Sequence, residues 1–547
     1  MSLSNLTWSR ACTEILYRIG VRHVCISPGS RNSSLTIGLT EHKHLNCFSI
    51  IDERSSAFFA LGIAKSTQTP VAVLSTSGTA AANFYPAVIE ANLSRTPLLV
   101  LTADRPPYLI NTGANQTIDQ HDLFGRHIRT CIDMGLPSSI ENLYAQLRRG
   151  FLNAAGLSHN GHLVNPPGPV HLNFPFSEPL IDLDEYNNPV DLNSHNFDRL
   201  NIEPINKTPP DYTGFPEILD QTISETEKLL VICGEGLNRE EQEGLVKLTE
   251  LLNIPVLADS LSGLRFGLNS EVVCTNYDCY EENIPTPDLI LRFGKKPNSK
   301  NLNQFMDKFK EKTLLFDPAG RFNDDAGQVH SYSVSDVWNL FSQKETVSNN
   351  NSEYFNQLKQ LESNYKFPDK DPFSEERIVS YLFDCLPENS NIFIGNSLPI
   401  RHVDNCVQAM DKKINVFSNR GASGIDGINS TAMGMAVTDK NADNFLLIGD
   451  VSFFHDLTGM QAAKYYNINL TIVVLNNGGG QIFNRLPYSK YGIKSFDEFW
   501  ITEPTLNIEN AVNLFDGSYR KLISLEELQK YMLQKNSGLQ VFECQTE

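Results

Sequence analysis

Short apolar runs of strand length alternate with helical patterns along most of the chain. In the N-terminal third, apolar runs near residues 21–26, 71–75 and 97–103 are each followed by a polar loop. Helical patterns with continuous apolar faces come between these runs. This repeated order of strand, loop and helix is typical of a parallel sheet. Such sheets bind ligands at the carboxyl ends of their strands, so the polar residues in these loops are the candidates for chemistry.

The same order recurs twice more, after polar stretches that have the composition of linkers. Residues 182–212 are rich in Pro and Asn, and residues 342–360 are also polar. Strand–loop–helix patterns follow near residues 228–325 and again from residue 372. The chain is therefore predicted to be α/β, with three domains of mainly parallel sheets and a Rossmann-like central one, at residues 1–182, 183–350 and 351–547.

The composition narrows the possible partners and compartment. A chain of 547 residues is too long for one core, and its formal net charge of −19 argues against nucleic acid and anionic membranes as partners. No apolar run approaches the roughly 20 residues of a membrane span. The start of the chain lacks the pattern of a signal peptide, and the ten cysteines show no CxxC spacing. We therefore expect a cytoplasmic protein with unpaired thiols.

The stretch from Gly449 to Phe483 places two oxygen-bearing side chains at strand ends. Asp450 ends one apolar run, Asn477 ends the next, and a helical pattern lies between them. In such a βαβ unit both residues fall at the same edge of the sheet. Carboxylate and amide oxygens suit Mg²⁺, which commonly joins them to a phosphate group. The alternative is that Gly-Asp and Asn-Gly are ordinary turn dipeptides.

This stretch resembles the metal and diphosphate motif of thiamine-diphosphate enzymes. The motif is Gly-Asp-x, then 24 residues, then Asn-Asn, as it stands from Gly449 to Asn477. The resemblance implies thiamine diphosphate with Mg²⁺ or Mn²⁺, and it implies metal ligation by the Asp, the second Asn and a carbonyl two residues later. It also implies that residues of the first half of the motif contact the cofactor. The implied metal ligands are Asp450, Asn477 and Gly479, and the implied cofactor contacts include Gly449, Val451 and Ser452. Val451 is a departure, since the family often has Gly there.

A thiamine enzyme also needs a carboxylate beside the cofactor's pyrimidine ring. Glu53 ends a strand pattern and precedes an apolar helix. From the residues alone, Asp52 and Glu53 are helix-capping acids, which favourable charge at a helix start explains. The resemblance instead implies that Glu53 activates the cofactor. It also implies a homodimer or a dimer of dimers, because in this family the two binding domains of one site come from different subunits.

Arginines and small polar residues occupy several other strand-end loops. Arg suits bidentate carboxylate binding, although a strand-end Arg is also commonly a surface residue or half of an ion pair. An acidic protein that places arginines in these loops suggests substrates with several carboxylates. The residues are Ser30, Arg31, Arg105, Gln116, Ser397, Arg401 and Arg420.

The segments that carry these residues resemble one branch of the thiamine family, which joins 2-oxoglutarate to isochorismate in menaquinone biosynthesis. This resemblance implies catalytic roles for Glu53, Gln116 and Ser397. It implies an apolar wedge against the cofactor at Ile425 and an apolar wall for the substrate at Phe483, and core packing is the alternative for both. The implied substrate contacts are Ser30, Arg31, Arg105, Lys295, Lys296, Arg401, Arg420 and Phe483. Lys296 is a departure, since an Arg is expected there.

Three other functions compete with this interpretation. Another thiamine carboligase, such as an acetolactate synthase, would share Glu53 and Asp450 but would have no need for several arginines. A non-catalytic protein of the same fold would have no need for either acid. A Rossmann dehydrogenase is disfavoured because no GxGxxG follows the first strand pattern.

Overall fold

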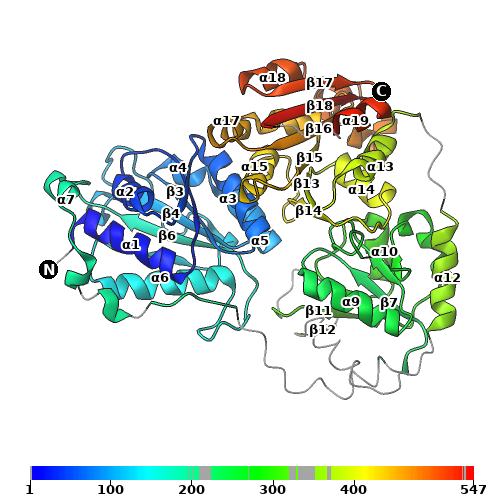
Figure 1. The fold of residues 1–547 in the computed structure, drawn as a ribbon, viewed down its shortest axis with the longest axis horizontal. Helices are drawn as coiled ribbons and strands as arrows, with labels where there is room; N and C mark the ends of the chain where they lie inside the picture. The colour runs from blue at the N-terminus through cyan, green and yellow to red at the C-terminus, as the bar shows by residue number, and fades with distance from the viewer. Residues whose placement is uncertain are drawn as a thin grey trace. The chain divides into compact units, whose positions relative to one another are not determined.

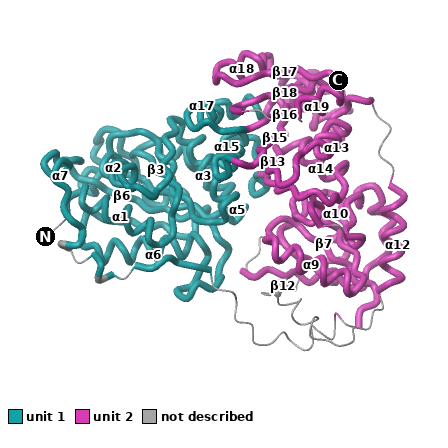
Figure 2. Tube along the Cα trace, in the orientation of Figure 1, with its two compact units in different colours: residues 1–209, 419–440, 452–469 teal, residues 210–418, 441–451, 470–547 magenta. Residues whose placement is uncertain are grey.

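The computed structural model contains three parallel sheets distributed over two compact units (Figure 1). It describes residues 3–195, 197–200, 202–207, 223, 225–268, 270–319, 328–330, 351–365, 371–532, 534 and 537–546. Figure 2 colours the units, which we call unit 1 and unit 2. Unit 1 comprises Met1–Pro209, Asn419–Lys440 and Ser452–Asn469, and unit 2 comprises Pro210–Ser418, Asn441–Val451 and Leu470–Glu547.

The sheet of unit 1 has six strands in the order β2-β1-β3-β4-β6-β5. Every pair in it is parallel. The strands in chain order are β1 (His23–Ile26), β2 (Asn46–Ser49), β3 (Val71–Ser75), β4 (Leu98–Asp104), β5 (Cys131–Asp133) and β6 (Pro169–Pro175). β3, β4 and β6 are buried at every position, as expected of strands covered on both faces.

Helices cover the first sheet. Trp8 of the first helix is fully buried and meets Phe174 and Phe176 edge to face, so this helix packs on β6. Ser4 accepts a hydrogen bond from the Thr7 N–H and starts that helix. The helices of this part are α1 (Asn5–Ile19), α2 (Ser33–Glu41), α3 (Glu53–Thr67), α4 (Thr79–Ala82), α5 (Tyr85–Ser94), α6 (Ile140–Ala155) and α7 (Leu183–Asn187).

Two helices of unit 1 approach one another backbone to backbone. α15 (Ile428–Thr438) packs on α3, and both consist of small and apolar residues at the contact. A Cβ on Gly62 would lie 2.0 Å from the Thr431 carbonyl oxygen, and a Cβ on Gly434 would lie 2.0 Å from that of Phe59. Glycine is therefore required at both positions. The segment Ser452–Asn469 also belongs to this unit and contains most of α16 (Asp450–His455) and all of α17 (Gln461–Tyr466).

Unit 2 contains the other two sheets. The central sheet has the order β12-β11-β10-β7-β8-β9, and the third has the order β14-β13-β15-β16-β18-β17. All pairs are again parallel, which confirms the predicted fold class. The central elements are β7 (Leu229–Cys233), α9 (Arg239–Leu251), β8 (Val256–Ala258), β9 (Val273–Cys274), β10 (Leu289–Phe293), α10 (Lys300–Lys308), β11 (Thr313–Phe316), β12 (Gln328–His330) and α12 (Ser352–Ser363).

The third sheet carries at its centre the two strands whose ends hold Asp450 and Asn477. β15 and β16 are neighbours there, and β13 lies on the other side of β15. The elements are α13 (Glu375–Cys385), β13 (Ser390–Ile394), α14 (Leu398–Cys406), β14 (Ile414–Ser418), β15 (Asn444–Gly449), β16 (Leu470–Asn476), α18 (Ile508–Leu514), β17 (Ser518–Leu522), α19 (Leu525–Met532) and β18 (Leu539–Gln545).

A buried ionic cluster joins the central and third sheets within unit 2. The Arg265 side chain is fully buried and lies 3.0 Å from Asp404 Oδ1. It also donates to the carbonyls of Ala258 and Val407, and the Tyr277 hydroxyl donates to Asp404. A buried guanidinium with this many partners fixes its surroundings rigidly.

Each sheet falls within one of the three predicted domains, whose boundaries stay a prediction. The two predicted linkers lie partly outside the described residues. In the part of the chain that the structure describes, no helix has the length and apolar character needed to cross a membrane.

Candidate active site

Asp450 and Asn477 lie at the same edge of the third sheet, as predicted. β15 and β16 pair in parallel, with Gly449 opposite Leu475, so both strands end at the same level. The Gly479 N–H donates to Asp450 Oδ2 at 2.7 Å, and the Val451 N–H donates to Oδ1 at 2.8 Å. Each oxygen of the carboxylate is thus fixed by one backbone group.

The electrostatics of Asp450 favour a cation beside it. Asp450 is 3% exposed, and burial raises its pKa to about 6. The two backbone N–H groups oppose this rise, while the nearby charge of Glu375 adds to it. A bound cation would favour the ionised carboxylate and reverse the effect of burial.

The Asn477 amide is held on one side and open on the other. Its Nδ2 donates to Glu375 Oε1 at 2.6 Å. Its Oδ1 is buried and has no hydrogen-bond partner within the described part of the chain. A buried acceptor without a donor is costly unless something else occupies the position. A metal ion fits this requirement, and Asp450 supplies the charge.

Gly479 completes this loop through its backbone. Its φ is 110°, and a Cβ would lie 2.3 Å from the Ile501 carbonyl oxygen, so only glycine fits. Its own carbonyl accepts from the Gln481 N–H at 2.9 Å and retains a second lone pair. Among the described residues no cluster of three or more His, Cys, Asp or Glu side chains could hold a metal. The donor set here is carboxylate, amide and carbonyl, which suits Mg²⁺ or Mn²⁺.

The structure gives Asp52 and Glu53, at the start of α3, different roles. Asp52 is the N-cap, and its Oδ1 accepts from the Ser55 N–H at 3.2 Å. Its Oδ2 accepts from the Thr458 hydroxyl at 3.0 Å. Glu53 is half-buried, and no hydrogen bond or ion pair of its carboxylate occurs among the described residues. The capping role therefore belongs to Asp52, which leaves Glu53 available for a ligand.

Two arginines lie at the carboxyl edge of the first sheet, in loops after β1 and β4. Arg31 is 6% exposed, donates to the Phe176 carbonyl at 3.0 Å and lies 3.2 Å from Glu178 Oε1. Its Nε is buried without a partner in the described chain. Arg105 donates to the Ser77 hydroxyl at 3.1 Å, and burial together with the charge of Arg31 lowers its pKa. Two guanidiniums whose charges repel one another at the same sheet edge favour a bound anion.

Gln116 lies beside the loop after β3. Its Nε2 donates to the Ser77 carbonyl at 3.0 Å, and its own carbonyl accepts from the Ser77 hydroxyl at 3.2 Å. Its φ is 53°, in the left-handed region. A Cβ on Gly78 would lie 3.0 Å from Gln116 Cγ. Ser30 is exposed in the loop after β1. Thus Ser30, Arg31, Glu53, Arg105 and Gln116 all lie at one edge of the first sheet.

Arg420 and Ile425 belong to the loop before α15, also in unit 1, and both are half-buried. A buried carboxylate holds this loop. Glu90 of α5 is 3% exposed and accepts from the N–H groups of Gly421 and Ala422 at 2.9 and 2.6 Å. Ser452 is buried in the same unit, two residues after Asp450 in the chain.

The remaining predicted residues of unit 2 lie at two different sheets. Ser397 follows β13 with a φ of 73°, and Arg401 donates to its carbonyl at 2.6 Å. Phe483 is 36% exposed and lies in the loop after β16. Because β13 and β16 are the neighbours of β15, these three residues lie at the sheet edge that carries Asp450. Lys295 and Lys296 instead follow β10 of the central sheet, where Lys295 pairs with Glu235 at 3.0 Å. Nothing in the structure explains Val451 or Lys296.

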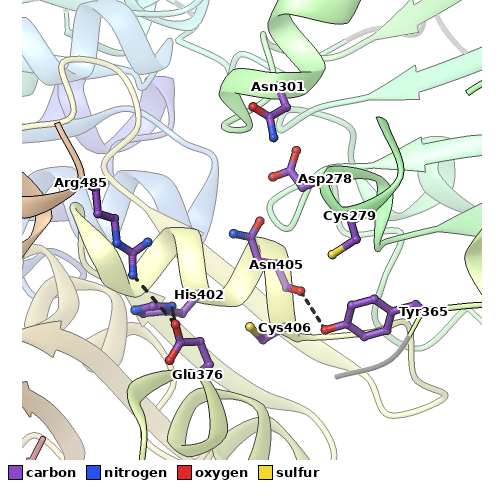
Figure 3. A pocket seen from close by; sticks show the side chains of 9 residues that line it. All are labelled: Asp278, Cys279, Asn301, Tyr365, Glu376, His402, Asn405, Cys406 and Arg485. Carbon is purple, nitrogen blue, oxygen red and sulfur yellow. Dashed lines mark hydrogen bonds and ion pairs between the residues drawn. The ribbon is translucent and has the colours of Figure 1, made fainter. Parts of the chain in front are cut away.

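A cavity of about 450 Å³ lies within unit 2, near the start of α13 (Figure 3). His402 of α14 lines it, and its Nδ1 lies 3.8 Å from Glu376 Oε1. Arg485, at the end of the 3₁₀ turn Gln481–Arg485, reaches the same Glu376 at 3.9 Å. The lining residues are Asp278, Cys279, Asn301, Tyr365, Glu376, His402, Asn405, Cys406 and Arg485.

Sequence reasoning missed two carboxylates that support these loops. Glu375 contacts Asn477 from 102 positions away, and Glu90 contacts Gly421 from 331 positions away. The sequence signal at Glu90 is a lone acid within the apolar helix pattern of residues 85–94. At Glu375 no signal distinguishes a supporting carboxylate from a favourable acid in the first turn of a helix.

Comparison with known families assigns a class to the two outer parts of the chain. Residues 6–123 match the thiamine pyrophosphate enzyme, N-terminal TPP binding domain. Residues 407–534 match the thiamine pyrophosphate enzyme, C-terminal TPP binding domain. Glu53 lies in the first match, and Asp450 and Asn477 lie in the second. The chain is a thiamine pyrophosphate (thiamine diphosphate) enzyme.

Individual relatives narrow the class further. A protein of Listeria welshimeri is 36% identical over 98% of this chain and 94% of its own length. One of Bacillus pumilus is 37% identical over 96% and 92%, and one of a Roseiflexus species is 34% identical over 95% and 91%. All three are named 2-succinyl-5-enolpyruvyl-6-hydroxy-3-cyclohexene-1-carboxylate synthase. This chain belongs to that synthase family.

Proposed function

We propose that this protein joins 2-oxoglutarate to isochorismate and releases carbon dioxide, giving 2-succinyl-5-enolpyruvyl-6-hydroxy-3-cyclohexene-1-carboxylate. The observation that supports this most strongly is family membership over nearly the whole chain, with Glu53, Asp450 and Asn477 all present. One carbon–carbon bond to a carboxylate breaks, and one carbon–carbon bond to the ring alkene forms. The alkene takes up a proton, so no external oxidant or reductant is required.

Thiamine diphosphate, when bound, supplies the electron sink for loss of carbon dioxide. Glu53 would hold the pyrimidine ring of the bound cofactor and would exchange a proton with it, because its half-buried carboxylate is not used in capping α3. Ile425 contacts the cofactor as an apolar wedge. Asp450, Asn477 and the Gly479 carbonyl bind Mg²⁺ or Mn²⁺, and Gly449, Val451 and Ser452 form the surrounding cofactor contacts.

The substrates carry several carboxylates, and the basic residues bind them. Arg31 and Arg105 are the first candidates, since they lie together at the sheet edge with a buried Nε open on Arg31. Gln116 and Ser397 hydrogen-bond the reacting groups, and Phe483 forms an apolar wall. Further substrate contacts come from Ser30, Lys295, Lys296, Arg401 and Arg420.

The active assembly that we propose is a homodimer or a dimer of dimers. This proposal follows from the family resemblance, in which one active site uses both subunits. Closed, symmetric homo-oligomers of this kind are common among enzymes.

The full-length protein with thiamine diphosphate, Mg²⁺, 2-oxoglutarate and isochorismate should give one product of the expected mass. Carbon dioxide release should be faster with 2-oxoglutarate than with pyruvate. Faster release with pyruvate would favour an acetolactate-type carboligase instead. The Glu53→Gln variant is the matched control, because any product that it forms measures the background reaction.

A further inference from the structure

Glu375 connects the metal loop to the neighbouring helices of unit 2. It is the first residue of α13, and its side chain is 11% exposed. Oε1 accepts from Asn477 Nδ2 at 2.6 Å, and Oε2 lies 2.6 Å from His402 Nε2. The Thr546 hydroxyl donates to Oε1 at 3.4 Å. The carboxylate therefore has a donor at each oxygen.

The orientation of the Asn477 amide decides whether this residue can bind a metal. An Asn side chain presents either its oxygen or its NH₂ group, and only the oxygen is a ligand. An ionised carboxylate accepts hydrogen bonds but donates none, so Glu375 selects the NH₂ group. The oxygen is then directed to the opposite side, where it is buried without a partner in the described chain.

We propose that Glu375 is a positioning residue for the metal, which fixes the amide of Asn477 with its oxygen toward the ion. The proposal rests on the metal and cofactor named in the proposed function. When a residue that hydrogen-bonds to a metal ligand is replaced, the metal affinity typically falls by roughly 10- to 100-fold. His402, which is 2% exposed, limits rotation of the Glu375 carboxylate.

The adjacent Glu376 extends this support to the other end of the same loop. It lies 3.9 Å from Arg485, which ends the turn that follows Asn477 and Gly479. Two consecutive carboxylates at the start of α13 thus contact both ends of the segment from residue 477 to residue 485. Negative charge is favourable at a helix start, so the helix tolerates both acids there.

Two substitutions separate orientation from charge. Glu375→Gln removes the charge but retains an oxygen that can accept from Asn477, while its NH₂ takes the place of the oxygen that faces His402 Nε2. Glu375→Asp retains the charge but shortens the side chain by one methylene, so it no longer reaches Asn477. Glu509→Ala is the control, because Glu509 is an exposed acid in the first turn of α18.

The readout is the free Mn²⁺ signal in electron paramagnetic resonance, with full-length protein and saturating thiamine diphosphate. We expect Glu375→Asp to weaken Mn²⁺ binding by roughly 10-fold or more, and Glu375→Gln by less than about 3-fold. Glu509→Ala should bind as the wild type does.

Equal losses in the two Glu375 variants, or a larger loss in Glu375→Gln, would overturn the proposal. Absence of Mn²⁺ binding by the wild type would overturn it together with the metal site. The measurement requires no substrate. If the wild type makes no product but Mn²⁺ affinity still falls from the wild type through Glu375→Gln to Glu375→Asp, the proposed reaction fails while the role of Glu375 stands.

Discussion

The Gly479 N–H donates to Asp450 Oδ2 at 2.7 Å, and this hydrogen bond joins the ends of β15 and β16. It brings the carboxylate of one strand end and the loop of the next into one arrangement. Because Asp450 is nearly fully buried, its ionised form requires compensating positive charge. The loop therefore has the properties of a cation site whose oxygens are already in place.

Asp450→Asn should weaken metal binding by roughly 10-fold or more, because it removes the one formal charge among the proposed ligands. Titration calorimetry of Mg²⁺ with thiamine diphosphate measures this directly. Asp443→Asn is the control, since Asp443 is exposed beside the start of β15. Unchanged affinity in Asp450→Asn would restore the interpretation of Asp450 as a turn residue.

Glu53→Gln should lower kcat by roughly 100-fold or more while the affinities for metal and cofactor change little. Asp52→Ala gives the opposite contrast. Asp52 caps α3, so its loss should cost about 1 kcal/mol of stability and leave the turnover of folded enzyme nearly intact. Steady-state rates and thermal unfolding of both variants test this pair. Near-normal turnover in Glu53→Gln would contradict the assigned role.

The proposed shared active site predicts that two inactive variants restore one another. If each site takes Glu53 from one subunit and Asp450 from the other, a mixed dimer of Glu53→Gln and Asp450→Ala has one intact site. A random mixture should then regain about a quarter of the wild-type activity. Co-expression with two affinity tags isolates the mixed species for assay. No recovery in that species would place both residues of a site in one subunit.

The positions of Glu53, Asp450 and Asn477 at strand ends were predictable, because hydrophobic patterning locates the ends of parallel strands. Which of the two acids caps α3 was not, because Asp52 and Glu53 have the same chemistry and only backbone geometry separates them. The two carboxylates that support the site loops were also not predictable from the sequence. Glu375 and Glu90 meet their partners across 102 and 331 positions, and no local pattern records a contact of that range.

His171 predicts how the first sheet responds to acid. It is fully buried in β6, its Nε2 lies 2.7 Å from the Thr102 hydroxyl, and Cys131 Sγ lies 3.4 Å from its Nδ1. Burial lowers its pKa from 6.5 to about 3. The unfolded chain therefore takes up the proton first as the pH falls. Stability that is present above pH 6.5 is lost progressively toward pH 3.

Lowering the pH from 7.5 to 5 should reduce the free energy of unfolding of unit 1 by about 2 kcal/mol through His171 alone. His171→Gln should be less stable at pH 7.5 but should lose less on acidification. Urea unfolding can be followed by the fluorescence of Trp8, which is buried against β6, after Trp338 and Trp500 are replaced by Phe. His159→Gln, at an exposed position, should retain the wild-type pH dependence. Parallel pH profiles for the wild type and His171→Gln would show that His171 does not cause the acid sensitivity.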